Sequence, residues 1–163
     1  MKKLYKEILD ILTDDCRYSP AKIAVMLGAP EAEVSAAIRD MEEKKMIVKY
    51  TAILNNETIE PAKVQALIEV KVTPQKSRGF DAIAEEIYQF DEVISVFLMS
   101  GGFDLSVLIE GDTLREVAMF VSERLSTLPT VISTATHFVL KKYKVEGVVI
   151  EEMNTPKRIA FQP

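Results

Sequence analysis

The residues best suited to contact another molecule lie between Glu31 and Lys45, in a stretch of helical spacing. Val34, Ile38 and Met41 share one side of that helix, which predicts that they are buried. The opposite surface then presents small side chains and one cation, namely Ala32, Ser35, Ala36 and Arg39. Arginine and serine can bond bases or phosphates, and alanine lets a helix approach thymine methyl groups. This surface predicts contact with double-stranded DNA; the alternative is an ordinary solvated helix surface.

A shorter helix is expected just before this one. Ser19 is a good capping residue, Pro20 suits the first helical position, and Gly28 ends the helix. Residues 47–54 are β-rich and follow the longer helix. Helix, glycine turn, helix and ribbon is the layout of a winged helix-turn-helix, which presents its second helix to the DNA major groove.

Two lysines flank this surface in the expected layout. Lys22 lies near the N-terminus of the shorter helix, where backbone amides attract anions, and Lys49 lies on the ribbon. Both are candidate phosphate contacts. Cations are nevertheless few, because residues 1–55 hold nine Lys or Arg against nine Asp or Glu, and residues 56–163 hold eleven against sixteen.

Acidic residues complicate the DNA hypothesis. Glu31 and Glu33 begin the longer helix, where they suit the helix dipole but would repel phosphate. Glu33 could instead accept a hydrogen bond from a cytosine amino group. Few cations release few counterions, so we expect weak binding per chain, a shallow salt dependence and a reliance on assembly.

The second half contains a candidate ligand site. The sequence Ser100-Gly101-Gly102 is expected to form a turn with exposed amides and a backbone that only glycine adopts readily. Such a turn could hold a ligand carboxylate while Asp104 meets an ammonium group, and Thr134 would add a hydroxyl. The alternative is a structural hairpin in which Asp104 satisfies local backbone groups.

The elements expected in this half follow the order β-α-β-β-α-β. The strands are residues 64–74, 93–99, 103–110 and 131–144, with helical spacing at 80–90 and 114–125. This order is that of a ferredoxin-like domain, whose helices cover one sheet face. Apolar residues also occupy the other face, which predicts a homodimer formed through the sheets.

The fold class is therefore α+β, a winged helix-turn-helix joined to a ferredoxin-like βαββαβ domain. The expected parts are a DNA-binding domain at residues 1–55, a linker at 56–63, a sensing and oligomerisation domain at 64–147 and a tail at 148–163.

Several functional classes lack the residues they need. Cys16 and His137 are the sole cysteine and histidine, so we expect neither a metal site nor a Ser/His/Asp or Cys/His catalytic set, and no cofactor. His137 is expected to be a packed or rim residue. No apolar run suits a membrane span or a secretory signal, which predicts a cytoplasmic protein.

The chain resembles the Lrp/AsnC family of feast/famine transcriptional regulators in the order and spacing of short motifs. These motifs are residues 8–12, 17–19, 23–28, 34–50, 100–105 and 134–144. Residues 100–105 look like the family's Gly-x-Tyr-Asp-Leu turn, although Phe103 stands where the tyrosine would be.

The resemblance implies a DNA reader joined to a domain that senses a small effector, with an amino acid as the expected class. It also implies dimers that often form octameric discs, with the effector bound between dimers near the Gly-x-Tyr-Asp turn. We therefore expect a regulator and not an enzyme. One alternative is an effector-binding interaction protein with weak or lost DNA affinity. The other is an enzyme like the related sirohaem decarboxylases, for whose chemistry His137 is the one histidine available in the sequence.

Overall fold

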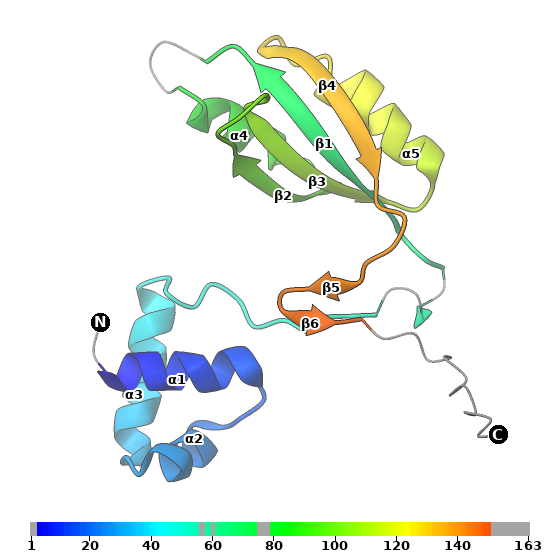
Figure 1. Cartoon of the computed structure of the whole chain (residues 1–163). Coiled ribbons are helices and arrows are strands. Elements are labelled where there is room, and N and C mark those ends of the chain that lie inside the picture. The colour runs from blue at the N-terminus through cyan, green and yellow to red at the C-terminus, as the bar shows by residue number, and fades with distance from the viewer. Residues whose placement is uncertain (1–2, 56–57, 60, 75–78, 151–163) are drawn as a thin grey trace, which may run out of the picture. The chain divides into compact units, whose positions relative to one another are not determined.

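The computed structural model describes residues 3–55, 58–59, 61–74 and 79–150. The chain divides into two compact units, Met1–Ile53 and Leu54–Pro163. Figure 1 shows helices alone in the first unit and a helix-covered sheet in the second. Among the described residues, no helix is long and apolar enough to cross a membrane.

The first unit is a bundle of three helices, α1 (Lys3–Asp14), α2 (Pro20–Leu27) and α3 (Glu31–Glu43). Each helix contributes an apolar side to one small core. The fully or nearly buried residues are Ile8, Leu12, Ile23, Ala24, Val34, Ala37 and Met41. In α3, helical spacing correctly predicted that Val34 and Met41 are buried. It did not identify Ala37, and Ile38 is half-buried.

The turn between α2 and α3 forms as predicted. The Ser19 hydroxyl accepts a hydrogen bond from the Lys22 amide at 3.3 Å, and Pro20 occupies the first turn. Gly28 ends α2 with φ of 62°, a left-handed conformation, and its amide bonds back to the helix. Because a Cβ atom disfavours that conformation, glycine allows this tight turn to form with little backbone strain.

Replacing Gly28 with alanine is expected to lower the free energy of unfolding by about 1 kcal/mol or somewhat more, since the left-handed backbone strains any side chain. Chemical denaturation measures this loss. Gly101→Ala is the matched control, because Gly101 has no left-handed φ and open space around it. Equal losses in the two variants would contradict the assigned conformations.

The predicted ribbon after α3 is wrong, since residues 47–55 form neither helix nor strand. A ribbon needs a second hydrogen-bonded strand, and the described part of the first unit contains only helices and turns. Side chains hold the segment instead. The Tyr50 hydroxyl donates to Glu42 at 2.9 Å, and the Cys16 thiol lies 3.9 Å from the Thr51 carbonyl oxygen. Burial and the Glu42 contact raise the pKa of Tyr50 to about 12.

The second unit confirms the predicted β-α-β-β-α-β order. Its elements are β1 (Val64–Val72), α4 (Asp81–Ile87), β2 (Val93–Leu98), β3 (Leu105–Gly111), α5 (Leu114–Met119) and β4 (Val131–Phe138). A π-helical segment, Phe120–Leu125, continues α5. The strands form one antiparallel sheet in the order β2-β3-β1-β4, and both helices pack on the same face around a core of aliphatic side chains (Figure 1).

The last predicted strand is too long. β4 stops at Phe138, and the chain then forms a small hairpin, β5 (Lys144–Val145) and β6 (Val148–Val149). Glu146 and Gly147 make its turn with φ of 47° and 84°. The hairpin thus crosses the expected boundary between the sensing domain and the tail, at residue 147. Alternating apolar residues are compatible with one long strand or with two short strands that form a hairpin. The rest of the expected tail, residues 151–163, lies outside the described residues.

Candidate nucleic-acid interface and ligand-binding loop

The exposed surface of α3 has the composition that the sequence predicted. Ala32, Ala36 and Arg39 are exposed, and Ser35 is half-buried at the edge of this surface. Among the described residues, Arg39 makes no ion pair or hydrogen bond through its side chain. The guanidinium group is therefore available to a base or a phosphate.

The neighbouring cations are also exposed. The Lys22 side chain projects from the start of α2, while its backbone amide is already bonded to Ser19. That amide is consequently satisfied within the helix cap, and the side chain is what could reach a phosphate. Lys49 is exposed too, but it lies on the segment that forms no ribbon.

Three of the five acidic residues of α3 fall into two sets. Glu31 and Glu33 are exposed in the first turn, next to Ala32, and no side chain caps that helix start. Asp40 instead accepts hydrogen bonds from Tyr5 at 2.8 Å and from Lys44 at 2.7 Å. Tyr5 and Asp40 lie far apart in sequence, so no local pattern could have indicated their contact. Glu31 and Glu33 are therefore the exposed carboxylates beside the predicted DNA contact Ala32.

An ion pair orders the turn before α2. The Arg17 guanidinium donates to both Asp15 carboxylate oxygens at 2.8 Å, and the Arg17 amide donates to Oδ1 at 3.0 Å. These hydrogen bonds lower the pKa of Asp15 to about 2. Arg17 therefore belongs to the structure of the turn that precedes the Ser19 cap.

Replacing Arg17 with alanine is expected to raise the pKa of Asp15 from about 2 toward its ordinary value of 3.8. In the native chain, the stabilisation from the ionised carboxylate is complete above pH 3.8 and disappears as the pH falls toward 2. Carboxyl NMR titration measures the shift. An unchanged Asp15 titration in the variant would refute the ion pair, and Arg115→Ala provides the control for loss of an arginine elsewhere.

The loop between β2 and β3 is closed by backbone hydrogen bonds. The Met99 amide donates to the Asp104 carbonyl at 2.8 Å, and the Asp104 amide donates to the Val70 carbonyl at 3.0 Å. The Asp104 carboxylate accepts from the Val72 amide at 2.9 Å. The pairing of β1 with β3 ends at Val70 and Leu105, so Asp104 satisfies the Val72 amide just beyond the end of that pairing.

The conformational role expected of the two glycines is wrong. Neither Gly101 nor Gly102 has a left-handed φ, and a Cβ atom would meet nothing within 4 Å at either position. A six-residue connection closed by the Met99 and Asp104 bond has enough length to turn without a special backbone. Both glycines are exposed, as is Ser100.

The structure brings two of the five expected ligand residues to the same region of the sheet. Asp104 bonds to Val70 on one side of β1, and Thr134 is the register partner of Val70 on the other side. The Thr134 hydroxyl lies 3.1 Å from that of Ser126. Ser100, Gly101 and Gly102 stay on the exposed loop.

Comparison with known proteins gives the family. A model of the Lrp/AsnC ligand-binding domain matches residues 65–149. The HTH-type transcriptional regulator YugG of Bacillus subtilis is 48% identical over 158 residues, which cover 96% of this chain and 95% of that protein. The chain belongs to the Lrp/AsnC family. It is thus a transcriptional regulator of the helix-turn-helix type.

Solved structures of this fold extend the comparison. A feast or famine regulatory protein of Mycobacterium tuberculosis complexed with L-methionine superposes with a TM-score of 0.74 at 19% identity, covering 92% of this chain and 99% of that one. A Neisseria meningitidis regulator in complex with L-Met gives 0.71 at 22% identity, with 89% and 93% covered. These likenesses show that the Lrp/AsnC fold spans both units.

His137 and Cys16 are the remaining residues considered for catalytic or metal chemistry. His137 is exposed on the sheet face opposite the helices, where its Nε2 lies 3.4 Å from Glu69, as expected of a rim residue. Among the residues that the structure describes, no three His, Cys, Asp or Glu side chains gather as metal ligands would. Cys16 is a free thiol in the turn before α2.

Proposed function

We propose that this regulator reads double-stranded DNA through the exposed surface of α3. The observation that carries the proposal is the combination of small side chains with one available guanidinium on the second helix of a helix-turn-helix. Arg39 and Ser35 would bond base edges or phosphates, and Ala32 and Ala36 would permit close approach. Lys22 and Lys49 would contact phosphates. We propose that the regulator acts in the cytoplasm, where it can reach the chromosome. We propose no enzymatic activity, because this role needs no catalytic group.

The proposed effector is an amino acid. Two proteins of the same fold were solved with L-methionine, which makes this ligand class the first to test. Asp104 could accept an ammonium group on its carboxylate, which already takes one amide hydrogen bond. Ser100, Gly101, Gly102 and Thr134 would supply the polar groups around the carboxylate end.

We also propose that the chain works as a homodimer joined through the uncovered sheet face, with octamers as a further assembly. Leu67 of β1 and Phe97 of β2 are 37% and 55% exposed on this face. Burying such side chains against a second copy would stabilise the dimer. Two recognition helices bound together would offset the weak contacts of one.

DNA binding is tested by gel shift with DNA from upstream of the protein's own gene at low salt. We expect a specific complex that weakens as salt increases, with a shallow slope because few cations contact phosphates. Failure to retain any genomic fragment at low salt would overturn the DNA proposal.

Effector binding is tested separately, by thermal unfolding in the presence of each of the twenty amino acids. A ligand at a hundred times its Kd should stabilise the folded state by about 2.7 kcal/mol. If no amino acid shifts the unfolding temperature, the amino-acid proposal fails.

An interaction protein with lost DNA affinity is the second candidate function. The exposed carboxylates of Glu31 and Glu33 at the start of α3 favour it, because both would face phosphates. Dimerisation and amino-acid binding with no DNA retention would select this candidate.

A further inference from the structure

A carboxylate, that of Glu69, lies in the middle of the sheet face that no helix covers. β1 is an inner strand of the sheet, and its buried neighbours Ile68 and Val70 face the helices, so Glu69 points to the other side (Figure 1). The register partners of Glu69 are the small residues Ser106 and Ala135. A partner that covers this face therefore also covers Glu69.

The sole histidine of the chain lies beside this carboxylate. His137 of β4 is the register partner of Leu67, which places it diagonally across from Glu69 on the same face. Its Nε2 atom lies 3.4 Å from the Glu69 carboxylate, and the two side chains are 56% and 38% exposed. Because water screens an exposed pair, the contact contributes little in the separate chain. Histidine gains its positive charge between about pH 8 and pH 5, so the contact is an ion pair only at the lower end of that range.

The other charged groups of this face do not replace the histidine. Lys71 is exposed two residues further along β1, and among the described residues its ammonium group forms no ion pair. Glu110 of β3 accepts a hydrogen bond from Gln65 at 2.6 Å, and Lys141 and Lys142 follow β4 near Gln65. β2 and β4 contain no further charged residue. The strands thus present two carboxylates against one ammonium, and they reach neutrality when the histidine is protonated.

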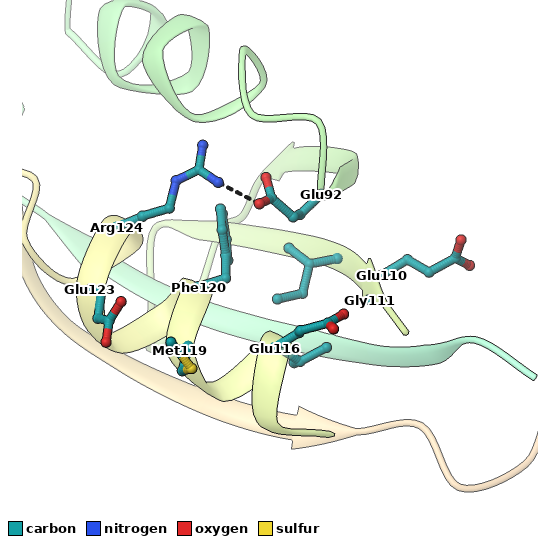
Figure 2. A pocket seen from close by; sticks show the side chains of 10 residues that line it. Glu92, Glu110, Gly111, Glu116, Met119, Phe120, Glu123 and Arg124 are labelled. Atoms are coloured by element: carbon teal, nitrogen blue, oxygen red, sulfur yellow. Dashed lines mark hydrogen bonds and ion pairs between the residues drawn. The ribbon is translucent and has the colours of Figure 1, made fainter. Parts of the chain in front are cut away.

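The helix-covered side of the sheet provides a contrast. There Glu92 pairs with Arg124 beside a cavity of about 320 Å³, as Figure 2 shows. The guanidinium carbon of Arg124 lies 4.5 Å from the centre of the Phe90 ring and 5.3 Å from that of Phe120. Arginine keeps its charge throughout the physiological range, so this pair stays matched. On the uncovered face, the matching of charges depends on pH.

We propose that the contact between Glu69 and His137 makes the association of two copies through this face pH-dependent, with tighter dimers at lower pH. Covering the face removes water from the Glu69 carboxylate. That loss is costly for a carboxylate without a counter-charge and is offset when the neighbouring histidine is protonated. The dimer therefore holds the His137 proton more favourably than the separate chain does.

The direction of the effect follows from linkage. Because association takes up protons, it is strongest at low pH and weakens as the pH rises from 6 to 8, where the histidine loses its charge. Low pH would thus favour the state that offers two recognition helices to DNA. This inference rests on the proposed homodimer, whose existence and whose pH dependence are separate results.

Fluorescence-detected sedimentation of the whole chain measures the dimer dissociation constant at pH 6 and pH 8, at one ionic strength. The sole cysteine, Cys16 in the first unit, takes the dye, and labelling also removes its thiol from the titration. We expect a constant that is about fivefold or more lower at pH 6, since each dimer contains two of these contacts. For a dimer too tight to dissociate on dilution, energy transfer between donor- and acceptor-labelled copies, followed after adding excess unlabelled chain, gives a dissociation rate that should be slower at pH 6.

The outcomes separate the two proposals. A dimer with equal constants at both pH values, or a tighter dimer at pH 8, would overturn the pH dependence and leave the homodimer standing. A chain that is monomeric at every concentration and both pH values would refute the homodimer and, with it, this inference.

Three variants assign the effect to its residues. His137→Gln places a neutral polar side chain at an exposed position, and the ratio of the two constants should fall below about twofold. Glu69→Gln should tighten the dimer at pH 8 and abolish or reverse the pH dependence, because no carboxylate is then buried without a counter-charge. Glu86→Gln is the matched control, since Glu86 is exposed on α4 and α4 packs on the other face, so it should keep the wild-type ratio. A full wild-type ratio in a folded His137→Gln chain would assign the effect to another group, such as the N-terminal amine, and overturn the proposal.

Discussion

Replacing Arg39 with alanine is expected to weaken DNA binding by about five- to 150-fold per recognition helix. Arg39 is the exposed cation of the α3 surface, flanked there by alanines and acids. A well-formed arginine contact to a base edge is worth about 1–3 kcal/mol, which gives that range of affinity. In a dimer both helices lose the contact, so the loss for the whole complex is larger. Gel-shift titration at fixed low salt measures it.

Arg115→Ala is the matched control for this prediction. Arg115 is exposed on α5 in the second unit, so its removal changes the net charge equally without touching the proposed interface. Arg39→Lys separates the two kinds of contact, because lysine retains a phosphate contact but loses paired bonds to guanine. Equal affinity for wild type and Arg39→Ala would remove α3 from the interface.

Replacing Ile8 with alanine is expected to unfold the helix-turn-helix unit while the second unit remains folded. Ile8 is 0% exposed at the centre of the three-helix core. Such a truncation costs about 2–5 kcal/mol, and a unit of this size has only a few kcal/mol of stability. DNA binding should disappear with the fold. Thermal unfolding by circular dichroism, with NMR signals assigned to each unit, measures the outcome.

Val25→Ala provides the control for this substitution. Val25 lies on α2 but is 78% exposed, so its truncation should change stability by less than about 0.5 kcal/mol. If the NMR signals of the β-sheet disappear together with those of the helices in Ile8→Ala, the two units do not have separate cores. An unfolding midpoint of Ile8→Ala equal to that of Val25→Ala would also contradict the account.

Local signals were enough to predict the elements that position the proposed DNA surface. The Ser19 cap, Pro20 and Gly28 act within one or two turns of chain, so their sequence order determines α2 and the turn after it. Elements that need a distant partner were predicted less well. The expected ribbon at 47–54 has no partner strand in the described part of the first unit. The apolar residues after Phe138 form a hairpin of their own.

The same division applies to the candidate sites. Helical periodicity places Ala32, Ala36 and Arg39 on one surface without knowledge of the fold. In contrast, the contact of Asp104 with Val72 depends on the register of β1 with β3 and on where that pairing ends, which no short pattern encodes. The cavity beside Arg124 was not predicted either, because Glu92 and Arg124 come together only when α5 packs on the sheet.

Coupling between ligand and DNA tests the central claim most directly. The measurement is the affinity of the whole chain for its own upstream DNA, with and without a saturating amino acid that shifts its thermal unfolding. A ligand-responsive regulator predicts a change of fivefold or more, and linkage requires DNA to change the ligand affinity by the same factor. Identical DNA affinities with and without bound ligand would contradict the claim.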